Sequence, residues 1–147
     1  MERMIFINLP VTNLERSKAF YGALGFRNEP KFSDNNAAMM VLSGTISVML
    51  LTHDFYSTFT TRPIAEPHGT SQVLLCIFCG SPDEVDRITQ AAKAAGGKVD
   101  ASQEDQTRGG PMYGRDFEDP DGHQWAPMWM DPDFAAKGAH PAEPVAA

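Results

Sequence analysis

Short apolar runs and one amphipathic stretch alternate along the first third of the chain. Residues 4–11, Met-Ile-Phe-Ile-Asn-Leu-Pro-Val, have the composition of a strand that ends at proline. Thr12 and Glu15 follow with the spacing of a capping box, so we expect a helix that begins there and ends at Gly25. Three strand-like stretches come next, at about residues 26–33, 37–43 and 46–52.

The second half of the chain repeats this order. Residues 72–79 are an apolar run typical of a buried strand, and Ser81 and Glu84 form a second capping box with Pro82 between them. Three more strand-like stretches follow the predicted helix, at about residues 98–104, 111–118 and 123–130. The sequence therefore predicts an α+β fold made of two βαβββ modules.

The pattern divides the chain into four segments. We expect a first module over residues 1–52, a connecting segment over 53–71, a second module over 72–130 and a poorly ordered tail over 131–147. The connecting segment is long for its position, which leaves room for a short helix or a mobile lid. We favour a linker whose aromatic side chains pack on a sheet edge.

The composition of the chain limits the classes of molecule that we expect it to bind. The net charge of −7 argues against nucleic-acid binding and against adhesion to anionic membranes. It is compatible with a cationic ligand, although an acidic excess also serves solubility. No apolar run approaches the ~20 residues of a membrane helix, and the first residues lack the features of a signal peptide. We therefore expect a cytoplasmic protein.

Cys76 and Cys79 have the C-x-x-C spacing of a redox or zinc pair. They lie in the apolar run over residues 72–79, and residues three apart on a strand point to opposite faces. A second C-x-x-C is absent from the sequence, and redox pairs normally open a helix. We expect two reduced, structural cysteines.

Two residue sets resemble the vicinal oxygen chelate superfamily, which includes glyoxalase I, extradiol dioxygenases and the fosfomycin- and bleomycin-resistance proteins. One is the stretch over residues 8–26, with its S-x-x-F-Y element ending at Tyr21 and its L-G-F element at residues 24–26. The other is the D-P-D-G-H turn over residues 119–123, followed by Gln124 and Trp125. The similarity covers residues 4 to about 130.

The resemblance implies two curved, barrel-like mixed sheets around a ligand site, and a homodimer. Metal enzymes of the family place a His or Glu ligand on the first and last strands of each module, where it holds a divalent metal that binds substrate oxygens. The motifs place these positions on Phe6, Leu50, Val73 and Ala126. None of these side chains can coordinate a metal, so we expect no divalent metal cofactor.

The four histidines offer a different route to a metal. His53 follows the fourth strand, His68 lies in the connecting segment, His123 in the late turn and His140 in the tail. A rebuilt site from His53 or His68 with Glu66 is conceivable, but we expect all four histidines to have surface or loop roles, with His123 bonded locally.

Strand alternation from the same alignment predicts a mostly apolar lining. The predicted ligand-binding residues are Phe6, Asn8, Leu50, Thr52, Val73, Tyr113, Arg115, Gln124, Ala126 and Met128. The strand over 111–118 could instead present the opposite set of side chains. Arg115 is a candidate for an anionic ligand group, and a salt bridge to Glu118 or Asp119 is the alternative.

Three hypotheses about function follow. One is a metal-independent small-molecule binder, as in the bleomycin-resistance proteins, which are acidic dimers that hold a cationic drug. Another is a glyoxalase-like lyase or a dioxygenase with a displaced metal. The remaining one is an interaction protein that uses the fold without ligand chemistry.

Overall fold

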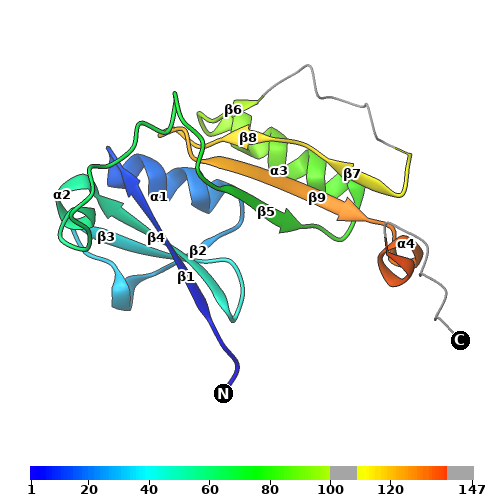
Figure 1. The fold of residues 1–147 in the computed structure, drawn as a ribbon, viewed down its shortest axis with the longest axis horizontal. Helices are drawn as coiled ribbons and strands as arrows, with labels where there is room; N and C mark the ends of the chain where they lie inside the picture. Colours follow the sequence, from blue (N-terminus) through cyan, green and yellow to red (C-terminus); the bar gives the residue numbers. More distant parts are fainter. Residues whose placement is uncertain (100–108, 139–147) are drawn as a thin grey trace, which may run out of the picture.

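The computed structural model describes residues 1–99 and 109–138. The first module forms one mixed sheet in the order β1-β4-β3-β2, in which β1 runs parallel to β4 (Figure 1). Its elements are β1 (Ile5–Val11), α1 (Leu14–Ala23), β2 (Arg27–Glu29), a 3₁₀ turn (Pro30–Phe32), β3 (Ala37–Val41) and β4 (Ile46–Thr52). The predicted strand over 26–33 ends early because Pro30 begins the 3₁₀ turn.

The second module forms a second mixed sheet in the order β5-β9-β8-β6, with β7 also paired to β9. Its elements are β5 (Leu74–Phe78), α3 (Pro82–Ala94), β6 (Lys98–Val99), β7 (Met112–Gly114), β8 (Phe117–Glu118) and β9 (Gln124–Met130). The two modules thus match the predicted α+β fold, and neither sheet closes into a barrel.

The predicted strand over 111–118 is divided into β7 and β8. The pairing register continues across the division, from Gly114 opposite Met128 to Phe117 opposite Trp125. Between these pairs Arg115 donates its backbone N–H to the carbonyl of Pro127, but Pro127 has no N–H to return the bond. The proline in β9 therefore interrupts the ladder. Residues 100–104 of the predicted strand over 98–104 lie outside the described residues.

The connecting segment begins with a short helix, α2 (His53–Tyr56), and the tail contains α4 (Pro132–Lys137). Within the tail, the Asp131 side chain accepts from the backbone N–H groups of Asp133 and Phe134 and caps α4. Residues 139–147 lie outside the described residues. None of the helices in the described ranges is long and apolar enough to cross a membrane.

The two long helices begin at capping residues of different kinds. Ser81 caps α3 by accepting from the N–H of Glu84, as predicted. The predicted cap of α1 is wrong by one residue, because Asn13 accepts from the N–H of Arg16 in place of Thr12. The hydroxyl of Thr12 donates instead to Asp121, in the second module.

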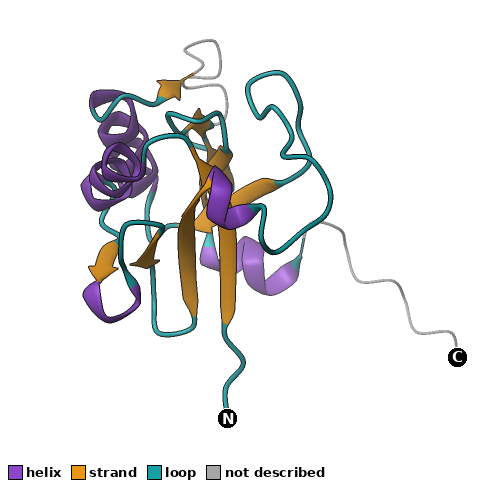
Figure 2. Ribbon diagram, turned by 90° about the vertical axis from the view of Figure 1, so that its left-hand side faces the viewer, coloured by secondary structure: helices purple, strands orange, loops and turns teal. Residues whose placement is uncertain are grey.

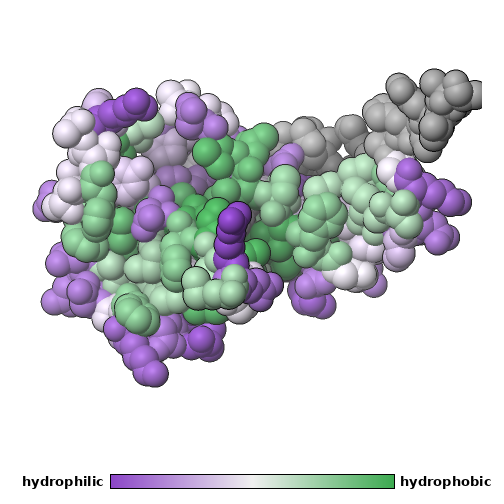
Figure 3. Space-filling model, turned by 60° about the horizontal axis from the view of Figure 1, so that its bottom comes forward, coloured by the Kyte–Doolittle hydropathy of each residue, from purple (hydrophilic) through white to green (hydrophobic). Residues whose placement is uncertain are grey.

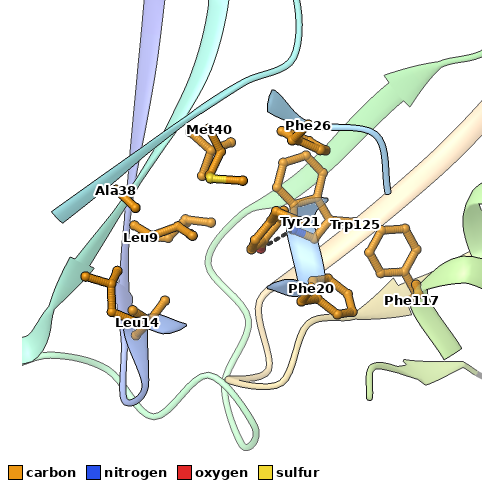
Figure 4. Packing of buried hydrophobic residues seen from close by; sticks show 13 residues of the cluster. Leu9, Leu14, Phe20, Tyr21, Phe26, Ala38, Met40, Phe117 and Trp125 are labelled. Atoms are coloured by element: carbon orange, nitrogen blue, oxygen red, sulfur yellow. Dashed lines mark hydrogen bonds between the residues drawn. The ribbon is translucent and has the colours of Figure 1, made fainter. Parts of the chain in front are cut away.

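Helices α1 and α3 lie on the same side of the strands, as Figure 2 shows. The main core is formed by α1 with both sheets, because Phe20 and Tyr21 of α1 pack with Phe117 and Trp125 of the second module (Figure 4). Trp125 stacks on Phe117 with centroids 6.5 Å apart and meets Tyr21 edge-on at 5.8 Å. One helix of the first module therefore contributes directly to the core of the second.

Candidate functional site

Each sheet has one face that packs on the helices and one face that does not, which we call its open face. On β1 and β4 the helix side carries Leu9 and Leu50, which belong to the main core. Alternation then places Phe6 and Asn8 on the open face, beside Ser47 and Met49 of β4. Phe6 is 46% exposed. The open face of the first module is therefore accessible at β1, where it presents one large apolar side chain, Phe6, and one amide, Asn8.

The predicted alternation of β4 is wrong by one residue. Leu50 is fully buried in the main core, and Met49 takes the open-face position next to Asn8. Thr52 does not line the open face either, because its hydroxyl accepts from the N–H of Phe55 and caps α2. Leu50 faces the helices because β1 and β4 pair with Leu9 opposite Leu50, and Leu9 itself contacts the core.

Tyr113 and Arg115 are also misplaced by the sequence prediction. Both side chains point to the helix side, where they meet Asp86 of α3. The Tyr113 hydroxyl donates to Asp86 Oδ1 at 2.5 Å, and Arg115 Nη1 lies 3.3 Å from the same oxygen. Arg115 is only 7% exposed. The opposite set of this strand, Met112 and Gly114, therefore faces outward. Among the described residues Arg115 pairs with Asp86, where the sequence suggested Glu118 or Asp119.

The other predicted lining residues lie on or beside the open face of the second module. Ala126 is opposite Cys76 and Met128 is opposite Phe78 in the parallel pairing of β5 with β9. Gln124 shares this face and accepts from the hydroxyl of Ser71 at 2.5 Å. Val73 is exposed and directly precedes β5. Binding by these residues, and by Phe6 and Asn8, remains a prediction.

Sequence reasoning missed most of the methionines on the open faces. Strand pairing places Met39 and Met49 on the first open face, and Met112 and Met130 join Met128 on the second. Five of the eight methionines of the chain thus lie on the open faces. The period-2 spacing of Met128 and Met130 was the available signal.

The residues at the implied metal positions do not fit a divalent metal. Phe6, Leu50, Val73 and Ala126 have no donor atom, and neither Met49 nor Leu74, which occupy the open face nearby, offers nitrogen or oxygen. Across residues 1–99 and 109–138, no group of three or more His, Cys, Asp or Glu side chains could hold a metal ion. His53, Glu66 and His68 do line one crevice of about 330 Å³, together with Arg16 and Asp121.

The cysteines lie on opposite sides of the second sheet, as strand alternation predicts. Cys76 is exposed on the open face, whereas Cys79 is buried with Val85 and Tyr113. Burial, followed by the nearby charge of Glu84, raises the pKa of the Cys79 thiol. Both thiols are free.

The D-P-D-G-H turn fastens the two modules together. Asp121 accepts from the backbone N–H and the hydroxyl of Thr12, at 2.9 and 2.8 Å, and from the Ser17 hydroxyl at 3.3 Å. His123 Nε2 donates to the carbonyl of Pro10 at 2.7 Å, so its bond is between modules and not local. The turn is thus hydrogen-bonded to the end of β1 and to the start of α1.

Asp119 lies deeper in the same turn. Its carboxylate accepts from the Tyr21 hydroxyl at 2.6 Å and from the backbone N–H groups of Asp121 and His123. Burial raises the pKa of Asp119, and burial followed by the Asp119 charge raises that of Tyr21 well above its ordinary value. Both side chains are buried away from either open face, which makes them structural groups and not candidates for proton transfer to a ligand.

A ligand-sized cleft opens where the modules meet. It has a volume of about 780 Å³ and lies between the end of α1, the β3–β4 turn, β5 and α3. Its walls include Leu24, Phe26 and Ile88, and Glu84 and Arg87 stand on its α3 side. Cys76 and Phe78 belong both to this junction cleft and to the second open face. Figure 3 shows hydrophobic side chains gathered across the middle of one face of the molecule, with hydrophilic ones around the margin and a hydrophilic projection in front of the middle.

Comparison with known proteins agrees with this architecture. A hypothetical protein from S. aureus is 27% identical, with a TM-score of 0.72, over 88% of this chain and 94% of its own. A glyoxalase/bleomycin resistance protein/dioxygenase family enzyme from Burkholderia phytofirmans PsJN has a TM-score of 0.71 at 16% identity, over 88% of this chain and 99% of its own. A glyoxalase-related enzyme from Fulvimarina pelagi has a TM-score of 0.70 at 19% identity, over all of both chains.

No protein of curated function matches the sequence. The family model of the Glyoxalase/Bleomycin resistance protein/Dioxygenase superfamily matches residues 3–126, which include both modules and the D-P-D-G-H turn. The chain therefore belongs to the Glyoxalase/Bleomycin resistance protein/Dioxygenase superfamily.

Proposed function

We propose that this chain is a metal-independent binding protein of its superfamily, which takes a small apolar or amphipathic molecule. The observation that carries the proposal is the apolar character of Phe6, Leu50, Val73 and Ala126, the positions where the family's metal ligands would stand. Because these four positions offer no donor atoms, they cannot hold the metal ion that would polarise substrate oxygens.

The ligand is held where the junction cleft meets the second open face. A cleft of about 780 Å³ between two modules has the size and placement of small-molecule sites. Phe78 stands at this meeting point and is 65% exposed. Methionines nearby on β7 and β9 supply adaptable apolar contacts.

A homodimer completes this site. Large hydrophobic side chains are exposed on or beside β1 and β5, including Ile5, Phe6, Leu74 and Phe78. Exposed apolar surface of this extent on a folded chain favours association, and a second copy would cover it. The net charge of −7 keeps a cationic amphiphile among the ligands to test.

Fluorescence titration with Nile red, a neutral apolar dye, tests the site. Ala91→Trp fills the junction cleft on α3, and Phe78→Ala removes the wall at its mouth, so each is expected to weaken binding at least tenfold. Ala136→Trp adds the same bulk at an exposed position on α4 and is the matched control. Unchanged affinity in both cleft variants would contradict the location of the site.

Metal analysis tests the chemistry separately. We expect the purified protein to bind the dye equally well before and after dialysis against a chelator. A stoichiometric content of nickel, zinc or iron, with binding lost on chelation, would favour the displaced-metal lyase or dioxygenase instead.

Two further measurements test the remaining parts of the proposal. Titration with a cationic glycopeptide tests whether the protein sequesters such a drug, and sedimentation equilibrium measures whether it is a dimer.

A further inference from the structure

Three methionines converge on one face of the β7–β9 pair. Met112 is the direct cross-strand partner of Met130, and Met128 lies two residues before Met130 on β9. Side chains of direct partners and of residues two apart on a strand share one face of the sheet. That face is the open face, because Tyr113 and Trp129, which alternate with them, pack on the helix side.

The spacing lets the three thioethers meet at one point. Cross-strand partners have Cβ atoms about 5 Å apart, and diagonal or next-but-one neighbours about 7 Å apart. A methionine side chain is long enough and has enough rotatable bonds to bring its sulfur to the middle of such a triangle. Gly114, the partner of Met128, has no side chain and leaves the space beside Met128 open. All three methionines are partly exposed.

The backbone under the three methionines is held on both sides. The carbonyl of Met128 accepts from the N–H of Cys79 at 2.7 Å, which ties it to the end of β5. On the other side, Asp131 donates its N–H to the carbonyl of Pro111 at 2.7 Å, just beyond the Met112–Met130 pair. The backbone positions of the three residues are therefore held before any ligand arrives.

We propose that Met112, Met128 and Met130 form a binding site for a soft monovalent cation, with copper(I) as the natural occupant. Thioether sulfur prefers soft ions such as copper(I) over hard or borderline divalent ions. The net charge of −7 favours the approach of a cation to the protein as a whole. The site uses none of the family's four metal positions, and its methionines also border the apolar ligand proposed above.

Silver(I) is the probe, because it is soft, monovalent and stable in air. In protein labelled with ¹³C at the methionine methyl groups, one equivalent of silver nitrate is expected to shift three methyl resonances and to leave the others in place. Met112→Leu, Met128→Leu and Met130→Leu each remove one shifted resonance, which identifies the set. Each is expected to weaken silver binding at least tenfold, although leucine keeps the volume and the apolar character.

Met39→Leu is the matched control, since Met39 lies on the other open face. Thiols also bind soft ions, so the titration is repeated in a Cys76→Ser, Cys79→Ala background. In the wild-type background the methyl resonances already report on the methionines directly, so the test stands even if the double variant folds poorly. If no methyl resonance shifts, or if the three leucine variants bind silver as the wild type does, the three methionines are apolar lining only and the proposal is wrong.

Discussion

The hydroxyl of Tyr21 donates to the carboxylate of Asp119 at 2.6 Å, and the two residues come from different modules. The same hydroxyl accepts from the indole N–H of Trp125 at 3.0 Å. Three buried polar groups thus satisfy one another inside an aromatic core, and each would lose a partner if the modules separated. The two modules are therefore coupled by a polar network as well as by apolar packing.

Tyr21→Phe tests this coupling. The substitution keeps the ring but leaves the Asp119 carboxylate and the Trp125 N–H each short of a bond, so we expect the free energy of unfolding to fall by about 1–3 kcal/mol. Urea unfolding measures the change. Tyr56→Phe, in the short helix α2, is the control and is expected to change stability by less than about 0.5 kcal/mol. Equal effects of the two substitutions would contradict the role of the network.

Asp121→Ala removes the acceptor that holds the turn to the start of α1. Thr12 loses the partner of both its N–H and its hydroxyl, and Arg16, with Nη2 at 3.5 Å, loses its ion pair. We expect a loss of about 2–4 kcal/mol, because the bonds are charge-assisted and largely buried. Faster hydrogen exchange at the Thr12 amide should accompany it. Asp116→Ala, at an exposed position, should leave both quantities unchanged.

The stability of the chain should depend on pH through Asp119. Burial raises the pKa of this carboxyl above its ordinary value of 3.8, so the folded chain holds the proton more tightly than the unfolded chain. The contribution is fully present below 3.8 and is lost as pH rises through the folded-state pKa.

The measurement is the unfolding free energy of the wild type minus that of Asp119→Asn, from about pH 3.5 to about pH 5.5. We expect this difference to decrease as pH rises. An increase over the same range would show that hydrogen bonding to the charged carboxylate outweighs burial.

Gly97 lies at a point of close backbone contact. A Cβ atom there would come within 2.6 Å of the Glu118 carbonyl oxygen and 2.9 Å of the Ala92 carbonyl oxygen and of the Phe20 ring. Two of these neighbours are backbone, so Gly97→Ala should cost about 1–3 kcal/mol in thermal or urea unfolding. Gly44→Ala, where nothing lies within 4 Å, is the control and should be close to neutral.

Much of the fold could be predicted from hydrophobic periodicity and caps. The βαβββ order appeared twice because each helix begins at a polar cap and ends at a glycine, Gly25 or Gly96. The β4 run Ile46–Thr52 was harder, since it is apolar on both faces and offers no alternation to read. Which side chains of β4 face the helices depends on the pairing of Leu50 with Leu9, and only the assembled sheet defines that pairing.

The candidate site was harder to predict than the fold. Arg115 became a buried partner of Asp86, which is 29 residues away in sequence, and no local pattern specifies that contact. Thr12 has the spacing of a helix cap in the sequence. Its actual hydroxyl partner, Asp121, lies more than a hundred residues further on, where no local pattern reveals it. The methionines of β7 and β9 read as ordinary apolar residues until strand pairing brought them to one face.

The D-P-D-G-H turn has a consequence for how such chains are classified. Every polar side chain in it, from Asp119 to His123, is committed to joining one half of the molecule to the other. A sequence that retains these five residues has retained its scaffold, whatever has become of its chemistry. The strand positions that face a ligand can be substituted while the sequence of the turn stays the same. Relatives that share the turn can therefore differ in whether they catalyse a reaction.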